Sequence, residues 1–191
     1  GASLVYGIEK NSELVKTSKE KLKNSQVPFH FFEIDLEDAE IPLPDQSVQL
    51  INFSNVLEHL HNRVGLLREL NRILHAEGYI CISIPNKNTP WKRLQRYVCV
   101  DSRDDIDHKI EYDKKALFRE LSEAGLKISS KLEPIVPSFP INGAISLTAC
   151  FSPSFYKWLQ NWKKSFVNAK PEHSIGWSFL CSKVGIEKTK D

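Results

Sequence analysis

The stretch VQLINFSNVLEHL, residues 48–60, decides the fold, because it joins an apolar strand to a crowded run of polar groups. Residues 48–53 are typical of a buried β-strand. Polar side chains then gather between Asn52 and Leu60, directly after that strand. In doubly wound sheets, ligands bind at the carboxyl ends of the strands. This segment is therefore predicted to line a binding site.

Upstream of this stretch the sequence predicts two more strands. Residues 4–8 form a short apolar run suited to a buried strand, and Glu9 ends it. Asn11 and Ser12 then offer side-chain oxygens that can cap a helix. The second predicted strand covers residues 30–34 and ends at Asp35.

Downstream, further helices and strands alternate. Apolar residues recur at helical spacing between residues 64 and 74 and predict an amphipathic helix. Glu77-Gly78 is read as a break before a strand over residues 79–84. Asp113 is predicted to cap another helix, which ends at Gly125 and turns three apolar residues inward: Leu117, Phe118 and Leu121. The last strand is expected over residues 177–184. This alternation predicts an α/β fold with a Rossmann-like, doubly wound, mostly parallel sheet.

The composition is that of an ordinary globular domain. The chain has 191 residues, of which 41% are hydrophobic and 26% charged, and a formal net charge of only +2. Such a small charge gives no field that would favour nucleic acid, so no nucleic-acid partner is expected. The four cysteines form no CxxC pair, and no segment is typical of a secretory signal, so we expect a cytoplasmic protein. The chain contains no methionine, so we expect that Gly1 is not the natural start.

Four motifs in order resemble the class I S-adenosylmethionine-dependent methyltransferases. The group that they resemble most includes quinone-biosynthesis O-methyltransferases and many unassigned bacterial enzymes, and the likeness runs from about Leu4 to Ile128. The motifs are Ile8-Glu9, Ile34-Asp35-Leu36, the segment from Asn55 to Leu60, and the segment from Gly78 to Asn86. Single motifs of this kind are weak, but four in order at the expected separations are specific.

The resemblance implies a seven-stranded sheet whose first strand, with its glycine-rich loop, lies outside this sequence. That strand would lie between the strands of residues 4–8 and 48–53, and both would otherwise expose an unpaired apolar edge. We therefore expect the strand upstream of Gly1. The implied organisation is a cofactor-binding core, a helical insertion and a final strand with its tail, over residues 1–133, 134–171 and 172–191.

The resemblance also assigns cofactor-binding residues. The Glu9 carboxylate would accept the ribose hydroxyls, with Lys10 beside it; from the residue alone, a solvated surface glutamate is equally plausible. Asp35 and Leu36 would contact adenine, although Asp35 also suits a simple loop carboxylate. The methionine end of the cofactor would be lined by Asn52, Phe53 and Ser54.

Two histidines are the candidates for catalysis. His108 is proposed as general base or substrate anchor, with packing against the following helix as the alternative. His59 is the second candidate, and it can instead orient its loop. Glu58, His59 and His108 could also converge on a divalent ion, as in small-RNA 2′-O-methyltransferases with a Glu-x-x-Glu-His motif. Asn55 stands where that motif has its first glutamate, and asparagine is a poorer ligand for a hard cation, so no metal is expected.

The predicted insertion carries an aromatic stripe with a basic flank. No charged residue occurs from Pro134 to Tyr156, and the apolar run inside this segment is too short to span a bilayer. The stripe is formed by Phe155, Trp158, Leu159, Trp162 and Phe166. Packing on its own domain or on the partner of a homodimer is the first interpretation. A substrate lid and weak membrane contact through residues 155–166 are the others.

The sequence thus predicts an S-adenosylmethionine-dependent methyltransferase that acts on a small or lipophilic acceptor, most plausibly at oxygen. The alternative is a non-catalytic, methyltransferase-like interaction module. A lower alternative is a metal-assisted RNA 2′-O-methyltransferase.

Overall fold

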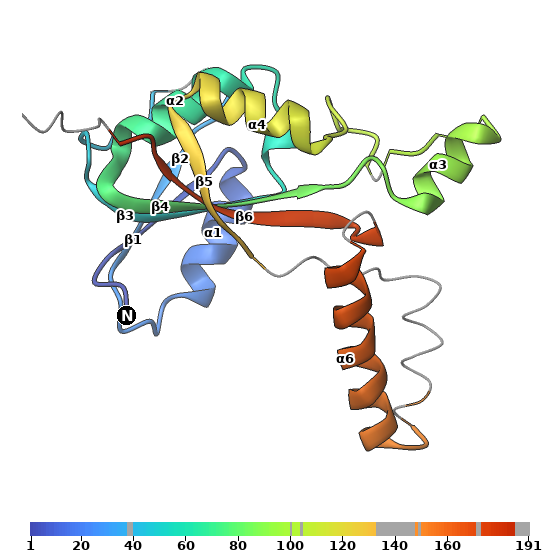
Figure 1. Ribbon diagram of the computed structural model, residues 1–191. Helices are drawn as coiled ribbons and strands as arrows, with labels where there is room; N and C mark the ends of the chain where they lie inside the picture. Colours follow the sequence, from blue (N-terminus) through green and yellow to red (C-terminus); the bar gives the residue numbers. More distant parts are fainter. Residues whose placement is uncertain are drawn as a thin grey trace, which may run out of the picture. The chain divides into compact units, whose positions relative to one another are not determined.

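The computed structural model describes residues 1–37, 40–99, 101–103, 105–132, 148, 150–170 and 173–185. The chain divides into two compact units, Gly1–Pro42 and Leu43–Asp191, which we describe separately. Figure 1 labels their helices and strands.

The first unit is a β-α-β arrangement. Its elements are β1 (Val5–Glu9), α1 (Ser12–Lys21) and β2 (Phe29–Glu33). The two strands pair in parallel, which the intervening helix makes possible. Asn11 caps α1 as predicted, since its side-chain oxygen accepts from the backbone N–H of Glu13 at 2.9 Å. Val15 is buried, whereas Leu14 is 53% exposed, so the apolar side chains of this helix are only partly covered.

The second unit contains a four-stranded sheet and its helices. The elements are β3 (Val48–Ser54), η1 (Leu57–His59), α2 (Arg63–Ile73), β4 (Leu74–Pro85), α3 (Pro90–Tyr97), α4 (Lys114–Glu123), β5 (Leu126–Lys131), α6 (Pro153–Ala169) and β6 (Gly176–Lys183). The strand order is β3-β4-β6-β5, with β4 between β3 and β6 (Figure 1). The β3–β4 pair is parallel, and both pairs made by β6 are antiparallel, as expected for the final strand.

The α/β class is confirmed, but two details of the sheet differ from the prediction. The described residues form six strands in two sheets, so a single seven-stranded sheet is not observed. The larger sheet is mixed and not mostly parallel, because β6 runs antiparallel to both of its neighbours. Among the described strands, β1 and β3 each end a sheet, and these are the two strands that were expected to lack a neighbour.

The core of the second unit lies between its sheet and the helices α2 and α4. The predicted stripe of α2 is confirmed, since Leu66, Leu67, Leu70 and Ile73 are all buried. Strand β4 contributes fully buried isoleucines at positions 80, 82 and 84.

The predicted ends of α4 are confirmed. Asp113 accepts from the backbone N–H of Ala116 at 2.8 Å, and Gly125 follows the helix with a φ of +73°. Leu117 and Leu121 are buried as predicted. Phe118 was wrongly assigned to the core, because it is 41% exposed, although its ring meets the buried ring of Phe179 on β6 edge to face.

The predicted break at Gly78 is also wrong, because β4 runs through it as one strand. The pairing of β3 with β4 shifts register between Val48 and Leu50. A Cβ atom at Gly78 would lie 2.9 Å from the carbonyl oxygen of Gln49 and 2.8 Å from Leu74 Cδ1. Glycine is therefore needed for the close approach of two strands at an irregularity and not for a turn.

Helix α6 exposes most of the aromatic stripe. Phe155, Trp158 and Trp162 are each about half exposed, at 48%, 58% and 51%, whereas Lys163 and Val167 are buried. These three side chains are therefore only about half covered. Residues 133–147, 149, 171 and 172 lie outside the described residues, so the insertion as predicted is only partly described. None of the described helices has both the length and the hydropathy that crossing a bilayer requires.

Candidate functional site

In the first unit, four predicted cofactor-binding residues lie at or just past the carboxyl ends of two neighbouring strands. Glu9 is the last residue of β1, and the N–H of Ile34, just past β2, donates to its carbonyl oxygen at 3.2 Å. Asp35 and Lys10 form an exposed ion pair at 3.6 Å, and Leu36 is half-buried. Because β1 and β2 are parallel, their carboxyl ends lie at the same edge of the sheet, and the residues that follow them lie close together.

The Glu9 carboxylate is oriented by the turn into α1. Its Oε1 accepts from the backbone N–H of Asn11 at 2.9 Å, and Glu9 is only half-buried. One carboxylate oxygen is thus held by the main chain. A carboxylate held in this way can receive hydroxyl donors from a ligand.

The predicted residues of β3 differ in what they offer. The hydroxyl of Ser54 donates to Asn52 Oδ1 at 2.8 Å, and Asn52 is exposed. Ser54 also lies 3.4 Å from the hydroxyl of Ser83 on β4. Phe53 is only 5% exposed and belongs to the core, so its backbone is the part that a ligand at this edge can contact.

The chain turns sharply after β3 and places a glutamate in the interior. Asn55 adopts a φ of +54°, a conformation that asparagine tolerates better than most residues. Leu57 is fully buried, and the next residue, Glu58, is 1% exposed. Burial raises the pKa of the Glu58 carboxyl above its usual value, and the hydrogen bond from its backbone and the two histidines beside it oppose that rise.

The two predicted catalytic histidines lie together beside this glutamate. One ligand atom from each of Glu58, His59 and His108 falls within 4.8 Å of the other two. The imidazole rings meet edge to face, with centroids 4.8 Å apart. His108 is 9% exposed. We call these three residues the Glu–His cluster.

Sequence reasoning missed two further members of this environment. His108 Nδ1 lies 2.7 Å from Glu111 Oε1, and Lys92 Nζ lies 2.6 Å from Glu111 Oε2. Lys92 is 4% exposed, so this ion pair is largely desolvated. Helix α3, which carries Lys92, was not predicted. The Thr89-Pro90 pair was the available signal, because threonine caps the helix and proline occupies its first turn.

The tautomer of His108 follows from this contact. A carboxylate paired with an ammonium group only accepts hydrogen bonds, so Nδ1 of His108 carries the proton. In the neutral imidazole, Nε2 is then the nitrogen without a proton, and it can take a proton or bind an ion.

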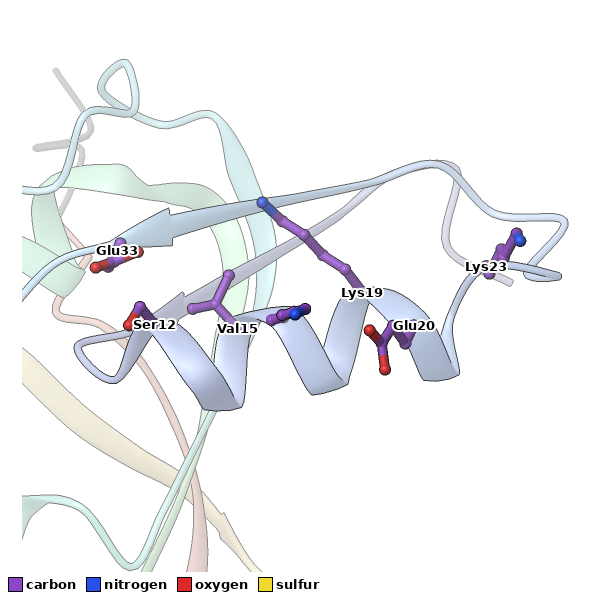
Figure 2. A pocket seen from close by; sticks show the side chains of 7 residues that line it. Ser12, Val15, Lys19, Glu20, Lys23 and Glu33 are labelled. Atoms are coloured by element: carbon purple, nitrogen blue, oxygen red, sulfur yellow. The ribbon is translucent and has the colours of Figure 1, made fainter.

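The surface of the first unit has a depression of about 410 Å³ between α1 and β2. Figure 2 shows Val15 and Lys19 pointing from α1 toward β2 at this place. The rest of its lining is polar or charged and consists of Ser12, Lys16, Glu20, Lys23 and Glu33. None of the predicted cofactor-binding residues lines it, so we do not assign it to the candidate site.

The structure thus gathers the predicted residues into groups within each unit. Glu9, Lys10, Asp35 and Leu36 form the group in the first unit. In the second unit, Asn52, Phe53 and Ser54 lie at the end of β3, His59 is the last residue of η1, and His108 lies in the loop between α3 and α4. Except for His108, these residues follow the ends of strands, as expected for the binding edge of an α/β sheet.

Comparison with known proteins gives a family and several relatives. Residues 1–82 match the family described as "Methyltransferase domain". A protein of Mycobacterium tuberculosis named probable S-adenosylmethionine-dependent methyltransferase is 41% identical over 51 residues, which are 27% of this chain and 19% of that protein. A demethylmenaquinone methyltransferase of Listeria welshimeri is 29% identical over 93 residues, 47% of this chain and 39% of its own. The chain therefore spans less than half the length of these curated relatives.

Solved structures share the fold at low sequence identity. An S-adenosylmethionine-dependent methyltransferase from Mesorhizobium loti superposes with a TM-score of 0.58 at 14% identity, covering 95% of this chain and 81% of that one. A [4+2]-cyclase superposes equally well, with a TM-score of 0.58 at 16% identity, covering 97% and 68%. This fold therefore hosts more than one chemistry, and the likeness shows the fold alone. Together, the family match over residues 1–82 and the shared fold support a class I S-adenosylmethionine-dependent methyltransferase.

Proposed function

We propose that this chain binds S-adenosylmethionine and takes part in methyl transfer to a small or lipophilic acceptor, at an oxygen atom. The observation that carries the proposal is the pair of carboxylates, Glu9 and Asp35, at the ends of neighbouring parallel strands inside the region that matches the methyltransferase family. Carboxylates at this position suit the hydroxyl and amino donors of an adenosine.

Within each unit, the residue types present suit that cofactor. Glu9 would accept from the ribose hydroxyls, and Asp35 would accept from the adenine amino group while Leu36 contacts the ring. Asn52 and Ser54 are polar groups at the end of β3 that suit the polar methionine end. S-adenosylmethionine supplies an already activated methyl group, so the protein's main tasks are alignment and proton removal.

His108 and His59 are the groups proposed to manage the acceptor. In its neutral form, the His108 imidazole can accept the proton of an acceptor hydroxyl at Nε2 or hold that oxygen in place, and Glu111 keeps its ring oriented. His59 lies against it and shares the same environment. The lipophilic character of the acceptor is supported by the partial match to a demethylmenaquinone methyltransferase. The small net charge argues against an RNA acceptor.

Calorimetric titration with S-adenosylhomocysteine tests the proposal, on the protein as its gene encodes it. We expect saturable binding that Glu9→Gln weakens by roughly ten- to a hundredfold, because hydrogen bonds to a charged group contribute about 1.5–3 kcal/mol. Glu13→Gln, which changes an exposed glutamate four residues away in the same unit, is the matched control and should bind normally.

The outcome separates the two classes of function. If the wild-type protein is folded by circular dichroism but gives no binding heat, the enzyme is rejected and the non-catalytic module is favoured. If binding occurs, incubation with hydroxylated quinols and smaller phenols, followed by mass spectrometry and NMR of the product, identifies the methylated atom. A product methylated at carbon or nitrogen would reject the O-methylation proposed here.

A further inference from the structure

The Glu–His cluster holds a buried group that the packing around it leaves unsatisfied. Glu58 is 1% exposed, and its Oε2 has no hydrogen-bond partner in the part of the chain that the structure describes. A buried carboxylate oxygen without a partner is costly, and such groups in folded proteins are usually paired or bound to an ion. The neighbours that face this carboxylate are the imidazoles of His59 and His108.

The distances suit three ligands of one ion. Carboxylate oxygens and imidazole nitrogens bind transition ions at about 2.0–2.2 Å, so two ligand atoms on one ion lie up to about 4.4 Å apart. The ligand atoms of the cluster lie within 4.8 Å of one another, so side-chain movements of less than about an ångström bring them to that separation.

The surroundings of His108 resemble those of a metal ligand. Histidines that bind metals usually donate their other ring N–H to a carboxylate, which fixes the ring and makes the ligand nitrogen more basic. Glu111 Oε1 accepts from His108 Nδ1 at 2.7 Å, and this leaves Nε2 for the ion. Lys92, on α3, holds the other oxygen of Glu111 at 2.6 Å.

The main chain ties the two ligand segments together. The carbonyl oxygen of Glu58 accepts from the N–H groups of Lys109 at 2.8 Å and Ile110 at 3.3 Å. The loop that carries His108 is therefore fixed to the turn that carries Glu58 and His59, although about fifty residues of sequence separate them. A site built in this way is pre-formed and does not depend on two free loops meeting.

We propose that Glu58, His59 and His108 bind one divalent first-row transition ion, such as Mn²⁺, Fe²⁺, Co²⁺ or Zn²⁺. Two imidazoles and one carboxylate suit these ions better than Mg²⁺ or Ca²⁺, which prefer oxygen ligands. Three protein ligands leave coordination positions open, as in catalytic metal sites. The set does not include Asn55, whose side chain was the reason to expect no metal from the sequence.

The ion gives the cluster a role that rests on the proposed function. An acceptor oxygen bound at the open position would be anchored and made more acidic by the ion. In that state His108 anchors the acceptor through the ion, and the proton of the acceptor hydroxyl passes to solvent water. Metal binding can be measured without methyl transfer, so the two proposals are tested separately.

The test is direct metal binding by the full protein after removal of metals with a chelator. Mn²⁺ binding is followed by loss of the free-ion electron paramagnetic resonance signal, and Co²⁺ binding by its visible absorption under reducing conditions. We expect one site per chain. Glu58→Gln and His108→Asn should each lower the affinity at least tenfold, and Glu111→Gln should lower it by roughly ten- to a hundredfold through the ring that it orients.

His75→Gln is the control, because His75 lies on β4 outside the cluster and its substitution should leave the affinity unchanged. Near-ultraviolet circular dichroism of each variant checks folding, and titration with S-adenosylhomocysteine on the same samples reports the cofactor site. No saturable binding by folded wild-type protein overturns the metal site, as does binding that neither Glu58→Gln nor His108→Asn weakens. Metal binding without S-adenosylhomocysteine binding rejects only the proposed function, and the reverse rejects only the metal site.

Discussion

Replacing Tyr112 with phenylalanine removes one oxygen atom from the interior of the second unit. Tyr112 is fully buried, and its hydroxyl donates to Glu120 Oε2. Glu120 is 5% exposed, and its other oxygen accepts from Arg63 Nε at 3.1 Å. The substitution therefore removes a neutral donor from a carboxylate that keeps its cationic partner.

The magnitude follows from those contacts. A hydrogen bond to a charged group contributes about 1.5–3 kcal/mol to the free energy of unfolding. The aromatic ring stays buried, so no apolar area is lost and no large cavity forms. Because Arg63 still pairs with Glu120, no uncompensated charge is left, and we expect the loss to be about 2 kcal/mol.

The loss should depend on pH in a defined direction. Burial first, and then the hydrogen bond to Glu120, raise the pKa of Tyr112 above its usual value. In the unfolded chain this tyrosine ionises near about pH 10, whereas in the folded protein it stays neutral. The stabilisation that Tyr112 gives to the folded protein is therefore complete below about pH 10. Above that pH it declines, by up to about 1.4 kcal/mol per pH unit. The difference in free energy of unfolding between wild type and Tyr112→Phe should therefore become smaller above about pH 10.

Urea unfolding followed by tryptophan fluorescence is the assay. All four tryptophans lie between residues 91 and 177, so their fluorescence reports the unit from Leu43 onward. Wild type and variant are compared at about pH 8 and about pH 11. Two results would refute the reasoning: free energies of unfolding of wild type and Tyr112→Phe that differ by less than about 0.5 kcal/mol at the lower pH, or a difference that is not smaller at the higher pH.

Three other predictions concern single residues. Asp113→Ala should lower the free energy of unfolding by about 1 kcal/mol in the same assay, because it removes the side-chain cap of α4. Asp113→Asn should retain most of the stability, because asparagine also caps helices well. Gly78→Ala should lower the free energy of unfolding by about 1–3 kcal/mol, because the new Cβ meets the carbonyl oxygen of Gln49 at 2.9 Å. Unchanged stability would contradict this and show that β3 and β4 can move apart to make room. Burial raises the pKa of the Cys181 thiol to about 12, so at about pH 8 it should resist alkylation in the folded protein while exposed Cys99 reacts, as mass spectrometry of tryptic peptides would show.

Local patterns determined most of the secondary structure, since they depend on residues a few positions apart. The stripe of α2, the Asn11 and Asp113 caps and the turn at Gly125 were all predicted correctly, because each is decided within one or two helical turns. The same kind of rule failed at Gly78. Whether a glycine there breaks a strand or lies inside one depends on the neighbouring strand, which local sequence does not specify.

In the candidate site, too, some residues could be proposed from the sequence and others were found only in the structure. The sequence proposed Glu9, Asp35 and His59, because polar residues after apolar strands fall at the binding edge of an α/β sheet, and it proposed His108 through the family resemblance. It did not identify Glu111 or Lys92. These two residues pair although nineteen positions separate them in the sequence, one in the loop before α4 and the other on α3.

The sequence by itself thus determined the class of the fold, the order of most of its elements and the chemistry available at the strand ends. Only the tertiary structure decided that Glu58 is buried with an unpartnered oxygen between two histidines, and that a second carboxylate orients one of them. The physical reason is that burial and charge pairing are set by long-range packing of η1, α3 and the loop before α4. Residue type and spacing alone leave those interactions open.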